Sequence, residues 1–361
     1  MKTILIASNV TGGLYEFRQE LLETLTKDNK VIVLGSKTGH IDDLKNLGCE
    51  VIETPLERHG TNPLKELKLV SKYKAIIKEK KPDVVLTYTV KPNVYVGMAC
   101  ASLGIPYIAN VTGVGPAIDN GGLLKFITLN LYRYGLRKAK KVFFQNRADM
   151  ELMEKEHVVK GPHELIPGSG VNLDRYSVLD YPKGDEIHFV FIARIVKEKG
   201  IEQYLDMVHA IKAKYTNTVF HICGNCTPAY EERIKKEVED GMIIYHGRIP
   251  DVTVVHKISS CTILPSFYPE GMNNVLLESC SLGRPIITTD RPGCREIVDD
   301  GINGCVVKQR DSQDLIEKVE QFLSLSWEER KAMGLAGRAK VEREFSREIV
   351  VNKYLEEIDN A

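Results

Sequence analysis

Two acidic residues, Glu270 and Glu278, lie eight positions apart in the segment 261–289, CTILPSFYPEGMNNVLLESCSLGRPIITT. If every residue between them were helical, a rise of about 1.5 Å per residue would separate them by about 12 Å. Two carboxylates at that separation can hold both ends of a molecule the size of a nucleotide-sugar. A helix is predicted to begin between the two acids, and the free N–H groups and positive dipole end of its N-terminus suit a diphosphate.

The elements that position these acids are predicted to be a strand, a polar loop, a helix and a second strand. The short apolar run 261–264 forms the first strand, and Pro265 bends the chain after it. The helix covers 275–282 and is stopped by a Gly-Arg-Pro sequence before the β-branched run 286–289. One acid therefore precedes the helix, and the other lies inside it.

The length and composition indicate a globular protein of two domains. At 361 residues the chain is long for one hydrophobic core, and its 43% hydrophobic share is too high for a disordered protein. The net charge is zero, but residues 1–170 contain 24 Lys and Arg against 18 Asp and Glu, whereas the remainder contains 25 against 31. A basic first half suggests an anionic partner for that half.

A cytoplasmic protein without an export signal or a membrane span is expected. The apolar run in MKTILIASNV ends at Asn9 and reads as a first strand, and no stretch reaches the roughly 18 apolar residues of a membrane span. The eight cysteines are scattered, several of them in apolar runs, which fits a reducing compartment. Cys223 and Cys226 have CxxC spacing, but no second pair follows, and we expect a glycine turn at the end of a strand.

Strands and helices alternate along the first half, as in a doubly wound parallel sheet. A strand at 3–8 is followed by Gly12, Gly13 and a helix, which puts the glycines where such sheets bind anions or substrates. The GxGxxG fingerprint is absent, and a tight turn explains two glycines equally well. Lys91 follows the strand 84–87 and is placed to meet a phosphate, although a surface lysine is an equally good interpretation.

Two basic stretches in the first half have the character of membrane-surface helices. Residues 62–81 place apolar side chains at helical spacing among lysines, which predicts an amphipathic basic helix. Residues 123–141, LLKFITLNLYRYGLRKAKK, are strongly apolar with aromatics and end in four cationic residues. An ordinary crossover helix with a solvated face would explain the first stretch. Two such stretches together favour docking on an anionic membrane surface.

The segment 270–307, EGMNNVLLESCSLGRPIITTDRPGCREIVDDGINGCVV, resembles the signature of the retaining glycosyltransferases of family 4, which have the GT-B fold. The resemblance covers essentially the whole chain and implies an α/β protein with two doubly wound parallel-sheet, Rossmann-like domains facing a central cleft. It implies an N-terminal acceptor-binding domain at 1–168, a nucleotide-sugar-binding domain at 169–345 and a helix at 346–361 that crosses back to the first domain. The Pro- and Gly-containing passage 165–174 carries the boundary.

The resemblance also implies roles for individual residues. Glu270, Arg194 and Lys199 are the implied catalytic residues, because preplaced cations stabilise the charge that develops on a departing nucleoside diphosphate. The implied donor-binding residues are Arg194, Lys199, Glu270, Gly271, Met272, Asn273, Asn274, Glu278, Gly13, Arg248 and Ile249. The implied acceptor-binding residues are Gly12, Lys91 and Thr112. Many members have a histidine near Thr112 that contacts the donor sugar, and its absence from NVTGVGPAI leaves that contact unassigned.

The implied reaction moves a sugar from a UDP-sugar to an acceptor hydroxyl with retention at the anomeric carbon. The sequence looks most like bacterial enzymes that extend lipid-diphosphate-linked glycans for capsule or exopolysaccharide. The implied acceptor is therefore a polyprenyl-diphosphate-linked saccharide at the inner face of the cytoplasmic membrane. No cofactor and no metal are expected, because the chain lacks Asp-x-Asp and because Arg194, Lys199 and a helix dipole can replace the charge of a metal.

Three other functions stay open at this point. A UDP-sugar 2-epimerase shares the two-sheet form but needs no acceptor, so products formed without an acceptor would identify it. A noncatalytic subunit that positions a partner transferase would bind donor without turnover. A nicotinamide dehydrogenase suits the alternation of strands and helices, but its phosphate-binding fingerprint is missing.

Overall fold

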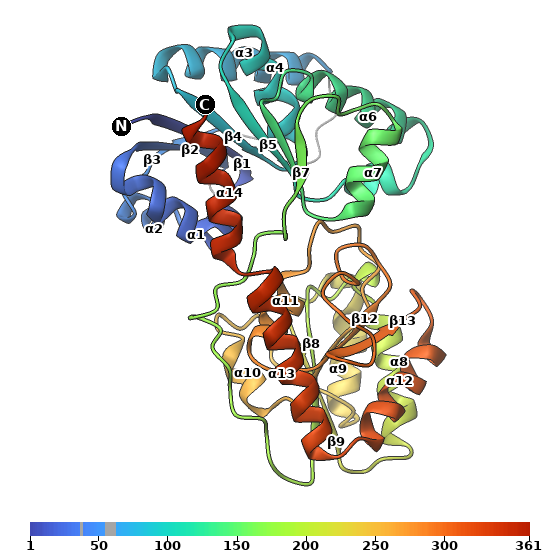
Figure 1. Ribbon diagram of the computed structural model, residues 1–361. Helices are drawn as coiled ribbons and strands as arrows, with labels where there is room; N and C mark the ends of the chain where they lie inside the picture. Colours follow the sequence, from blue (N-terminus) through green and yellow to red (C-terminus); the bar gives the residue numbers. More distant parts are fainter. Residues whose placement is uncertain (37–38, 55–62) are drawn as a thin grey trace. The chain divides into compact units, whose positions relative to one another are not determined.

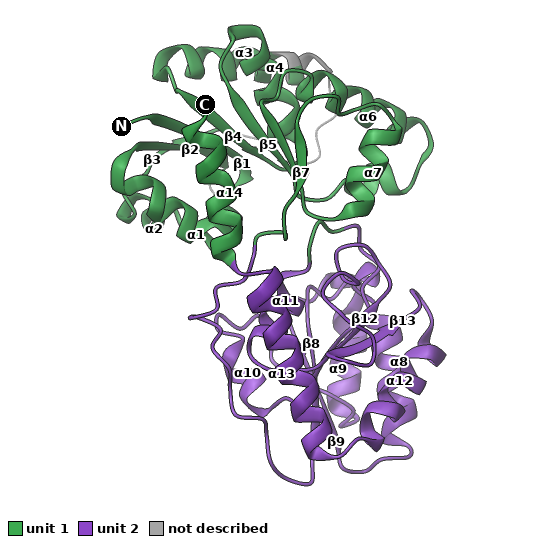
Figure 2. Cartoon of the chain, in the orientation of Figure 1, with its two compact units in different colours: residues 1–169, 270–272, 347–361 green, residues 170–269, 273–346 purple. Residues whose placement is uncertain are grey.

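The chain forms two compact units, which are described separately (Figure 2). The computed structural model describes residues 1–36, 39–54 and 63–361, without the side chains of residues 63–65 and 67. Unit 1 comprises Met1–Ser169, Glu270–Met272 and Arg347–Ala361, and unit 2 comprises Gly170–Pro269 and Asn273–Ser346. The sequence placed the first division after residue 168 and did not anticipate that three residues from the middle of the second half pack in unit 1.

Unit 1 is built on a seven-stranded parallel sheet with the strand order β3-β2-β1-β4-β5-β6-β7. Ile4, Leu5 and Ile6 in the interior strand β1 are all fully buried, as expected for a parallel strand covered on both faces. The chain leaves β1 and β4 toward opposite faces, so the point between these neighbours is the switch point of the sheet. The strands are β1 (Thr3–Val10), β2 (Lys30–Ser36), β3 (Glu50–Glu53), β4 (Val84–Tyr88), β5 (Tyr107–Val111), β6 (Lys141–Phe144) and β7 (His163–Leu165).

Helices cover both faces of this sheet (Figure 1). On one face Leu21 of α1, Leu44 of α2 and Tyr354 of α14 are buried in a common core. On the other face Tyr73 of α3 and Leu129 of α6 share a core with α4 and α7. The helices are α1 (Thr11–Asp28), α2 (Ile41–Asn46), α3 (Pro63–Lys80), the π-helical turn η1 (Pro92–Val96), α4 (Gly97–Leu103), α5 (Pro116–Asp119), α6 (Gly122–Leu136), α7 (Arg147–Lys155) and α14 (Arg347–Asp359).

Unit 2 is built on a six-stranded parallel sheet with the strand order β10-β9-β8-β11-β12-β13, and its switch point lies between β8 and β11. The strands are β8 (Ile187–Ile192), β9 (Thr218–Cys223), β10 (Ile244–Tyr245), β11 (Cys261–Leu264), β12 (Ile286–Thr289) and β13 (Gly304–Val307). The helices are η2 (Lys197–Lys199), α8 (Ile201–Lys212), η3 (Pro228–Tyr230), α9 (Glu231–Glu239), α10 (Thr253–Ile258), α11 (Asn274–Ser281), α12 (Ser312–Ser324) and α13 (Trp327–Glu344).

The alternation of side chains along β8 explains why helices cover both faces of this sheet. Phe189 points to one face, where its ring stacks on Phe220 at 5.3 Å between centroids and meets Phe322 of α12 edge-on. Val190 and Ile192 share the other face with Val255 of α10. Both units are therefore parallel sheets between helical layers, which confirms the predicted fold class.

The sequence missed the short elements β3, β7, β13, α2, α5 and α10, together with α12. The run MIIYH at 242–246 predicts a strand of five residues, but only Ile244–Tyr245 of β10 pair with the neighbouring strand. The predicted basic helix is α3, although residue 62 and the side chain of Lys65 lie outside the described residues. None of the helices in the described part of the chain has the length and apolar character needed to cross a bilayer.

Candidate functional site

The carboxyl ends of β8 and β11 meet at the switch point of unit 2, and the loops that follow them are bonded to each other. The backbone N–H of Phe267 donates to the carbonyl of Glu198 at 2.8 Å. Because β8 and β11 are adjacent parallel strands, the turn before α8 and the loop before α11 form one continuous surface at this edge. Ligands of doubly wound sheets bind at such an edge, so a ligand site is expected here.

Arg194 and Lys199 both lie against the ring of Tyr268 on this surface. The Lys199 ammonium is 5.2 Å from the ring centroid, and the guanidinium carbon of Arg194 is 5.9 Å from it. The face of a tyrosine ring attracts cations, so Tyr268 holds the two positive charges of the loop after β8 close together. Sequence reasoning predicted both cations and missed Tyr268, whose signal was its position two residues before Glu270.

Helix α11 begins at Asn274, six residues after Tyr268, and a side chain caps its N-terminus. The side-chain oxygen of Asn273 accepts a hydrogen bond from the backbone N–H of Leu276 at 3.2 Å. The backbone N–H of Asn273 donates to the carbonyl of Gly293 at 2.8 Å. Asn274 is the first residue of the helix, and Glu278 lies one turn further on, half-buried. The predicted donor residues Asn273, Asn274 and Glu278 thus belong to one short helix that starts at the switch point.

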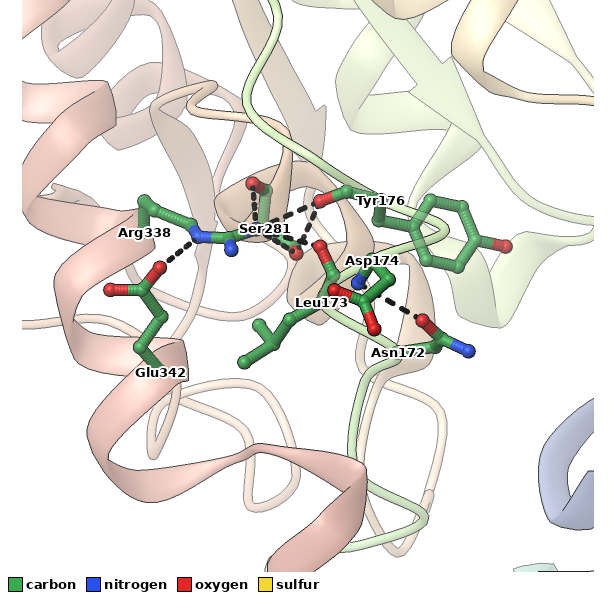
Figure 3. Close-up of polar contacts among 7 residues, drawn as sticks. All are labelled: Asn172, Leu173, Asp174, Tyr176, Ser281, Arg338 and Glu342. Atoms are coloured by element: carbon green, nitrogen blue, oxygen red, sulfur yellow. Dashed lines mark hydrogen bonds and ion pairs between the residues drawn. The ribbon is translucent and has the colours of Figure 1, made fainter. Parts of the chain in front are cut away.

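The other end of α11 is held by Arg338 of α13 (Figure 3). One guanidinium nitrogen of Arg338 donates to the last carbonyl of the helix, at Ser281, at 3.1 Å and to the carbonyls of Leu173 and Tyr176 at 3.2 and 3.0 Å. A cation at a helix C-terminus also stabilises the helix dipole. Arg338, which no motif pointed to, therefore fixes the helix that carries Glu278.

The segment Glu270–Met272 packs in unit 1, where a buried asparagine holds its backbone. The Asn146 amide nitrogen donates to the carbonyls of Gly271 at 2.9 Å and Glu270 at 3.2 Å. Asn146 also caps α7, because its oxygen accepts from the N–H of Asp149 at 2.8 Å. The sequence assigned these three residues to the second domain and gave no role to Asn146, which lies 124 positions before Glu270 and follows no local pattern.

Gly271 lies too close to its neighbours for any side chain. A Cβ atom there would come within 2.5 Å of the side-chain oxygen of Gln145 and 2.7 Å of the carbonyl carbon of Thr112. The predicted acceptor residue Thr112 and the predicted donor residue Gly271 are thus direct neighbours. Met272 is 6% exposed and lies beside Gly168, so any contact it makes with a donor comes from its backbone.

The switch point of unit 1 holds the other predicted residues. Gly12 and Gly13 form the first turn of α1, directly after β1. Lys91 follows β4, and its ammonium is paired with the Glu66 carboxylate at 2.8 Å, both side chains being largely buried. A further cation was missed: Arg18 of α1 is 4% exposed, and its guanidinium lies 5.2 Å from the ring centroid of Tyr88.

The remaining predicted residues follow β10. Arg248 is exposed, and Ile249 packs against the cluster that contains Val190 and Ile192. Gly224, which follows Cys223, has a φ of 142°, and a Cβ there would come within 1.8 Å of the carbonyl oxygen of Ala193. The CxxC sequence is therefore the glycine turn that was expected. Within residues 1–36, 39–54 and 63–361, no group of three or more His, Cys, Asp or Glu side chains is arranged to hold a metal ion.

Three histidines form a hydrogen-bonded row on one face of unit 2, apart from these residues. His221 lies between His188 and His246, with 2.9 Å between ring nitrogens on each side. Burial, with a smaller contribution from the two neighbouring rings, lowers the pKa of His221 to about 4. Burial also lowers the pKa of His256 in α10 to about 3. Both rings are therefore neutral near pH 7, which matters for stability more than for the candidate site.

Two protein families match the chain, one after the other. The family described as glycosyl transferase 4-like matches residues 5–146, and the family described as glycosyl transferases group 1 matches residues 180–340. The chain is 24% identical to the N,N'-diacetylbacillosaminyl-diphospho-undecaprenol alpha-1,3-N-acetylgalactosaminyltransferase of Campylobacter jejuni, over 98% of this chain and 97% of that protein. It is 25% identical to the capsular polysaccharide biosynthesis glycosyltransferase CapM of Staphylococcus aureus, over 44% of this chain and 42% of that protein.

The fold matches solved structures over its full length. HepE of Anabaena, crystallised in complex with UDP and glucose, aligns with 100% of this chain and 100% of its own, with a TM-score of 0.80 and 16% sequence identity. At that identity the match shows a shared fold.

Proposed function

Because the chain belongs to the glycosyltransferases of the GT-B type, with a glycosyl transferase 4-like domain ahead of a group 1 domain, we propose that it transfers a sugar from a UDP-sugar to a lipid-diphosphate-linked saccharide. The name of the Campylobacter relative specifies a diphospho-undecaprenol acceptor, and HepE was crystallised with UDP and glucose. CapM belongs to capsular polysaccharide biosynthesis, so assembly of a bacterial surface polysaccharide is the process we propose.

The observation that carries the proposal is the arrangement at the switch point of unit 2. Arg194 and Lys199 lie on the ring of Tyr268, in a loop that is bonded to the one leading into capped helix α11. A nucleoside diphosphate gains negative charge on its leaving oxygen as the bond to the sugar breaks. Cations and helix N–H groups fixed at that oxygen stabilise the transition state more than the ground state, because the charge is largest there.

The two acids have separate roles in this proposal. Glu278, on the second turn of α11, accepts hydrogen bonds from the ribose hydroxyls of the donor. Glu270 holds hydroxyls of the sugar, and the N–H groups of Gly271 to Asn274 lie near the sugar and the diphosphate. Asn146 acts indirectly, since its amide fixes the backbone of Glu270 and Gly271. Arg248 and Ile249, which were predicted to bind the donor, are proposed to lie beside its nucleotide base.

The proposed chemistry needs no covalent enzyme intermediate and no metal. The acceptor oxygen attacks the anomeric carbon from the face that the diphosphate leaves, which preserves the configuration. The bond from the anomeric carbon to the diphosphate oxygen breaks, and that oxygen takes the proton of the acceptor hydroxyl. Arg194 and Lys199 provide the positive charge that a divalent metal would otherwise supply. Full activity in excess chelator is the expected result.

The acceptor is proposed to bind in unit 1. Gly12, Lys91 and Thr112 are the residues proposed to contact it, with Lys91 placed for its phosphates. A polyprenyl-diphosphate saccharide is held in a bilayer, so the protein would work at the inner face of the cytoplasmic membrane as a peripheral protein. The excess of Lys and Arg in the first half, 24 against 18 acids in residues 1–170, suits an anionic acceptor and an anionic membrane.

A mass-spectrometric turnover assay tests the proposal. The purified protein is given a panel of UDP- and GDP-sugars with synthetic prenyl-diphosphate saccharides, beside Glu270→Ala, Lys199→Ala and the control Lys197→Ala. Lys197 lies in the same turn as Lys199 with 66% of its side chain exposed. Glycosylated acceptor from the wild type and the control, with large losses in the other two variants, is the expected result. Donor consumed without glycosylated acceptor would instead indicate epimerisation or hydrolysis, and donor binding without turnover would indicate a noncatalytic subunit.

A further inference from the structure

Helix α6 carries large apolar side chains on the face that points away from the protein core. Leu123 is 74% exposed, Phe126 is 66% exposed and Tyr134 is 58% exposed, and Leu124 and Ile127 are exposed with them. The inward face of the helix is apolar as well, since Leu129, Tyr132 and Leu136 are buried. A helix on the surface of a globular protein normally turns polar residues outward, so an apolar outward face indicates a surface that something else covers.

Positive charge lies on the same helical layer as this apolar face. Helices α3, α4 and α6 share one core on the same side of the unit 1 sheet (Figure 1). On α3, Lys68, Lys72 and Lys78 are exposed, and Arg137 and Lys138 are exposed directly after α6.

The acidic residues of α3 are already compensated. Glu66 is paired with Lys91 at 2.8 Å, and Glu79 is paired with Lys80 at 3.2 Å. Next to α6, Glu156 is paired with Lys125 at 3.3 Å. Among the described side chains, the layer of α3, α4 and α6 therefore presents an apolar strip on α6 and exposed cations on α3 and directly after α6 that no ion pair compensates.

We propose that this layer is a membrane-docking surface, with the outward side chains of α6 inserted between lipid headgroups and the lysines of α3 lying on an anionic bilayer. Insertion of an apolar helix face and attraction to anionic lipid are the two contributions that hold interfacial helices on membranes. This inference rests on the proposed function, because a lipid-linked acceptor lies in a bilayer. It adds to that function the surface by which unit 1 would bind the bilayer. The docking surface is defined by Leu123, Leu124, Phe126, Ile127 and Tyr134 with Lys68, Lys72, Lys78, Arg137 and Lys138.

The charges favour a bilayer over a second copy of the chain. A symmetric dimer built on this surface would bring the same patch of each copy together, and the lysines of α3 would then oppose cations of the partner copy. A bilayer with anionic headgroups complements both the apolar strip and the positive flank. A nucleic acid would complement the lysines but would leave Leu123 and Phe126 without an apolar environment.

Vesicle flotation without donor or acceptor measures the binding directly. The full chain is mixed with phosphatidylcholine vesicles that contain about one third phosphatidylglycerol, a composition that gives a negative surface. The test variant is Leu123→Ser with Phe126→Ser. The matched control is Ile302→Ser with Leu335→Ser, because these unit 2 side chains are 61% and 44% exposed and lie outside the proposed surface.

We expect the wild type and the control to float with the vesicles, and the test variant to bind at least about tenfold more weakly. Lys72→Gln with Lys78→Gln should weaken binding by roughly tenfold, and raised salt should remove that difference. Transfer to a short, water-soluble acceptor should be the same in the test variant and the wild type. Failure of transfer with every acceptor would refute the proposed function and leave the vesicle result standing.

Three results would overturn the docking surface. The first is a wild type that stays with the soluble fraction at every vesicle concentration, and the second is a test variant that floats as well as the wild type. The third is a wild type that sediments as a dimer in the ultracentrifuge while the test variant sediments as a monomer, which would assign the apolar strip to a second copy. Thermal unfolding of each variant beside the wild type confirms that lost binding is not lost folding.

Discussion

The two units have the same type of sheet, and each has a switch point, but the two switch points are built differently. In unit 2, Arg194 and Lys199 come from one six-residue stretch and share the ring of Tyr268. In unit 1, Lys91 is paired with Glu66, and Arg18 is buried against Tyr88.

The difference shows how one architecture can provide two kinds of binding surface. In unit 2 two cations lie on one partly exposed ring, whereas in unit 1 the ammonium of Lys91 lies opposite a carboxylate and the guanidinium of Arg18 is buried. We therefore expect unit 2 to bind the more highly charged group, the donor diphosphate. Unit 1 should recognise its ligand by shape and hydrogen bonds, with charge contributing less.

Loss of the Lys199 ammonium should have the largest effect on activity. Lys199→Ala should lower kcat/KM by about a thousandfold, because a preorganised charge at the leaving group is worth about that much in transition-state stabilisation. Lys197→Ala should stay within about threefold of the wild type, since its side chain is mostly exposed in the same turn. Steady-state kinetics with the donor identified by the turnover assay measure both. Equal losses in the two lysine variants would remove the distinction between the two switch points.

Loosening the Glu270 backbone should have the next largest effect. Asn146→Ser keeps an oxygen that can cap α7 but removes the amide that reaches the carbonyls of Glu270 and Gly271. We expect kcat to fall about a hundredfold while the thermal midpoint changes little, since positioning acts in the transition state. Parallel losses of activity and of thermal stability would instead show that Asn146 serves only to stabilise α7.

Acid should destabilise unit 2 before unit 1, because unit 2 buries His256. Burial, helped by the charge of Arg284, lowers the pKa of His256 to about 3, and neither ring nitrogen has a hydrogen-bond partner among the described residues. The ordinary pKa is about 6.5, so below that pH the unfolded chain takes up a proton that the folded chain does not. Stability is thus unaffected by this group above pH 6.5 and falls as the pH drops toward 3.

The variant His256→Leu removes that proton-linked loss. At pH 5 the free energy of unfolding of the variant should exceed that of the wild type by about 2 kcal/mol more than it does at pH 7. This value follows from about 1.4 kcal/mol per pH unit between the ordinary pKa of about 6.5 and pH 5. Urea unfolding followed by the fluorescence of Trp327, the single tryptophan, reports on unit 2 alone. If the free energies of unfolding of variant and wild type differ by the same amount at pH 5 and pH 7, His256 is not the source of the acid sensitivity of unit 2.

Removing Lys91 should have the smallest effect. Since Glu66 already compensates its charge, Lys91→Gln should raise the acceptor KM by less than about tenfold, and it should lower thermal stability because Glu66 is left largely buried without its partner. The double variant with Glu66→Gln should behave like the single one. A loss of a hundredfold or more would show that Lys91 leaves Glu66 to bind the acceptor, and unit 1 would then have an anion site comparable to that of unit 2.

The sequence allowed prediction of features whose residues lie close together in the chain. Alternating strands and helices, and the capped helix after β11, follow from local periodicity and turn residues. Arg194 and Lys199 could be named because their types and short spacing match the family that the sequence resembles. The edge strand β10 was predicted too long, because Ile244 is 46% exposed and an apolar run does not reveal where pairing stops.

Contacts between distant parts of the chain could not be predicted in the same way. Asn146 meets Glu270 across 124 positions, and Arg338 meets Ser281 across 57. Neither pair produces a period or a motif, because an asparagine at a helix N-cap and an arginine on a helix surface each have an ordinary local explanation. For the same reason, the packing of Glu270–Met272 in unit 1 could only be found in three dimensions.

Helix α14 has a consequence for the order in which the molecule assembles during translation. Val350, Tyr354 and Ile358 of α14 complete the core shared by α1 and α2, and the Asn110 amide donates to the Tyr354 hydroxyl at 2.5 Å. The ribosome releases every residue of unit 2 before it releases α14. Unit 2 can therefore finish folding on the nascent chain while unit 1, although begun first, still exposes one apolar face of its sheet.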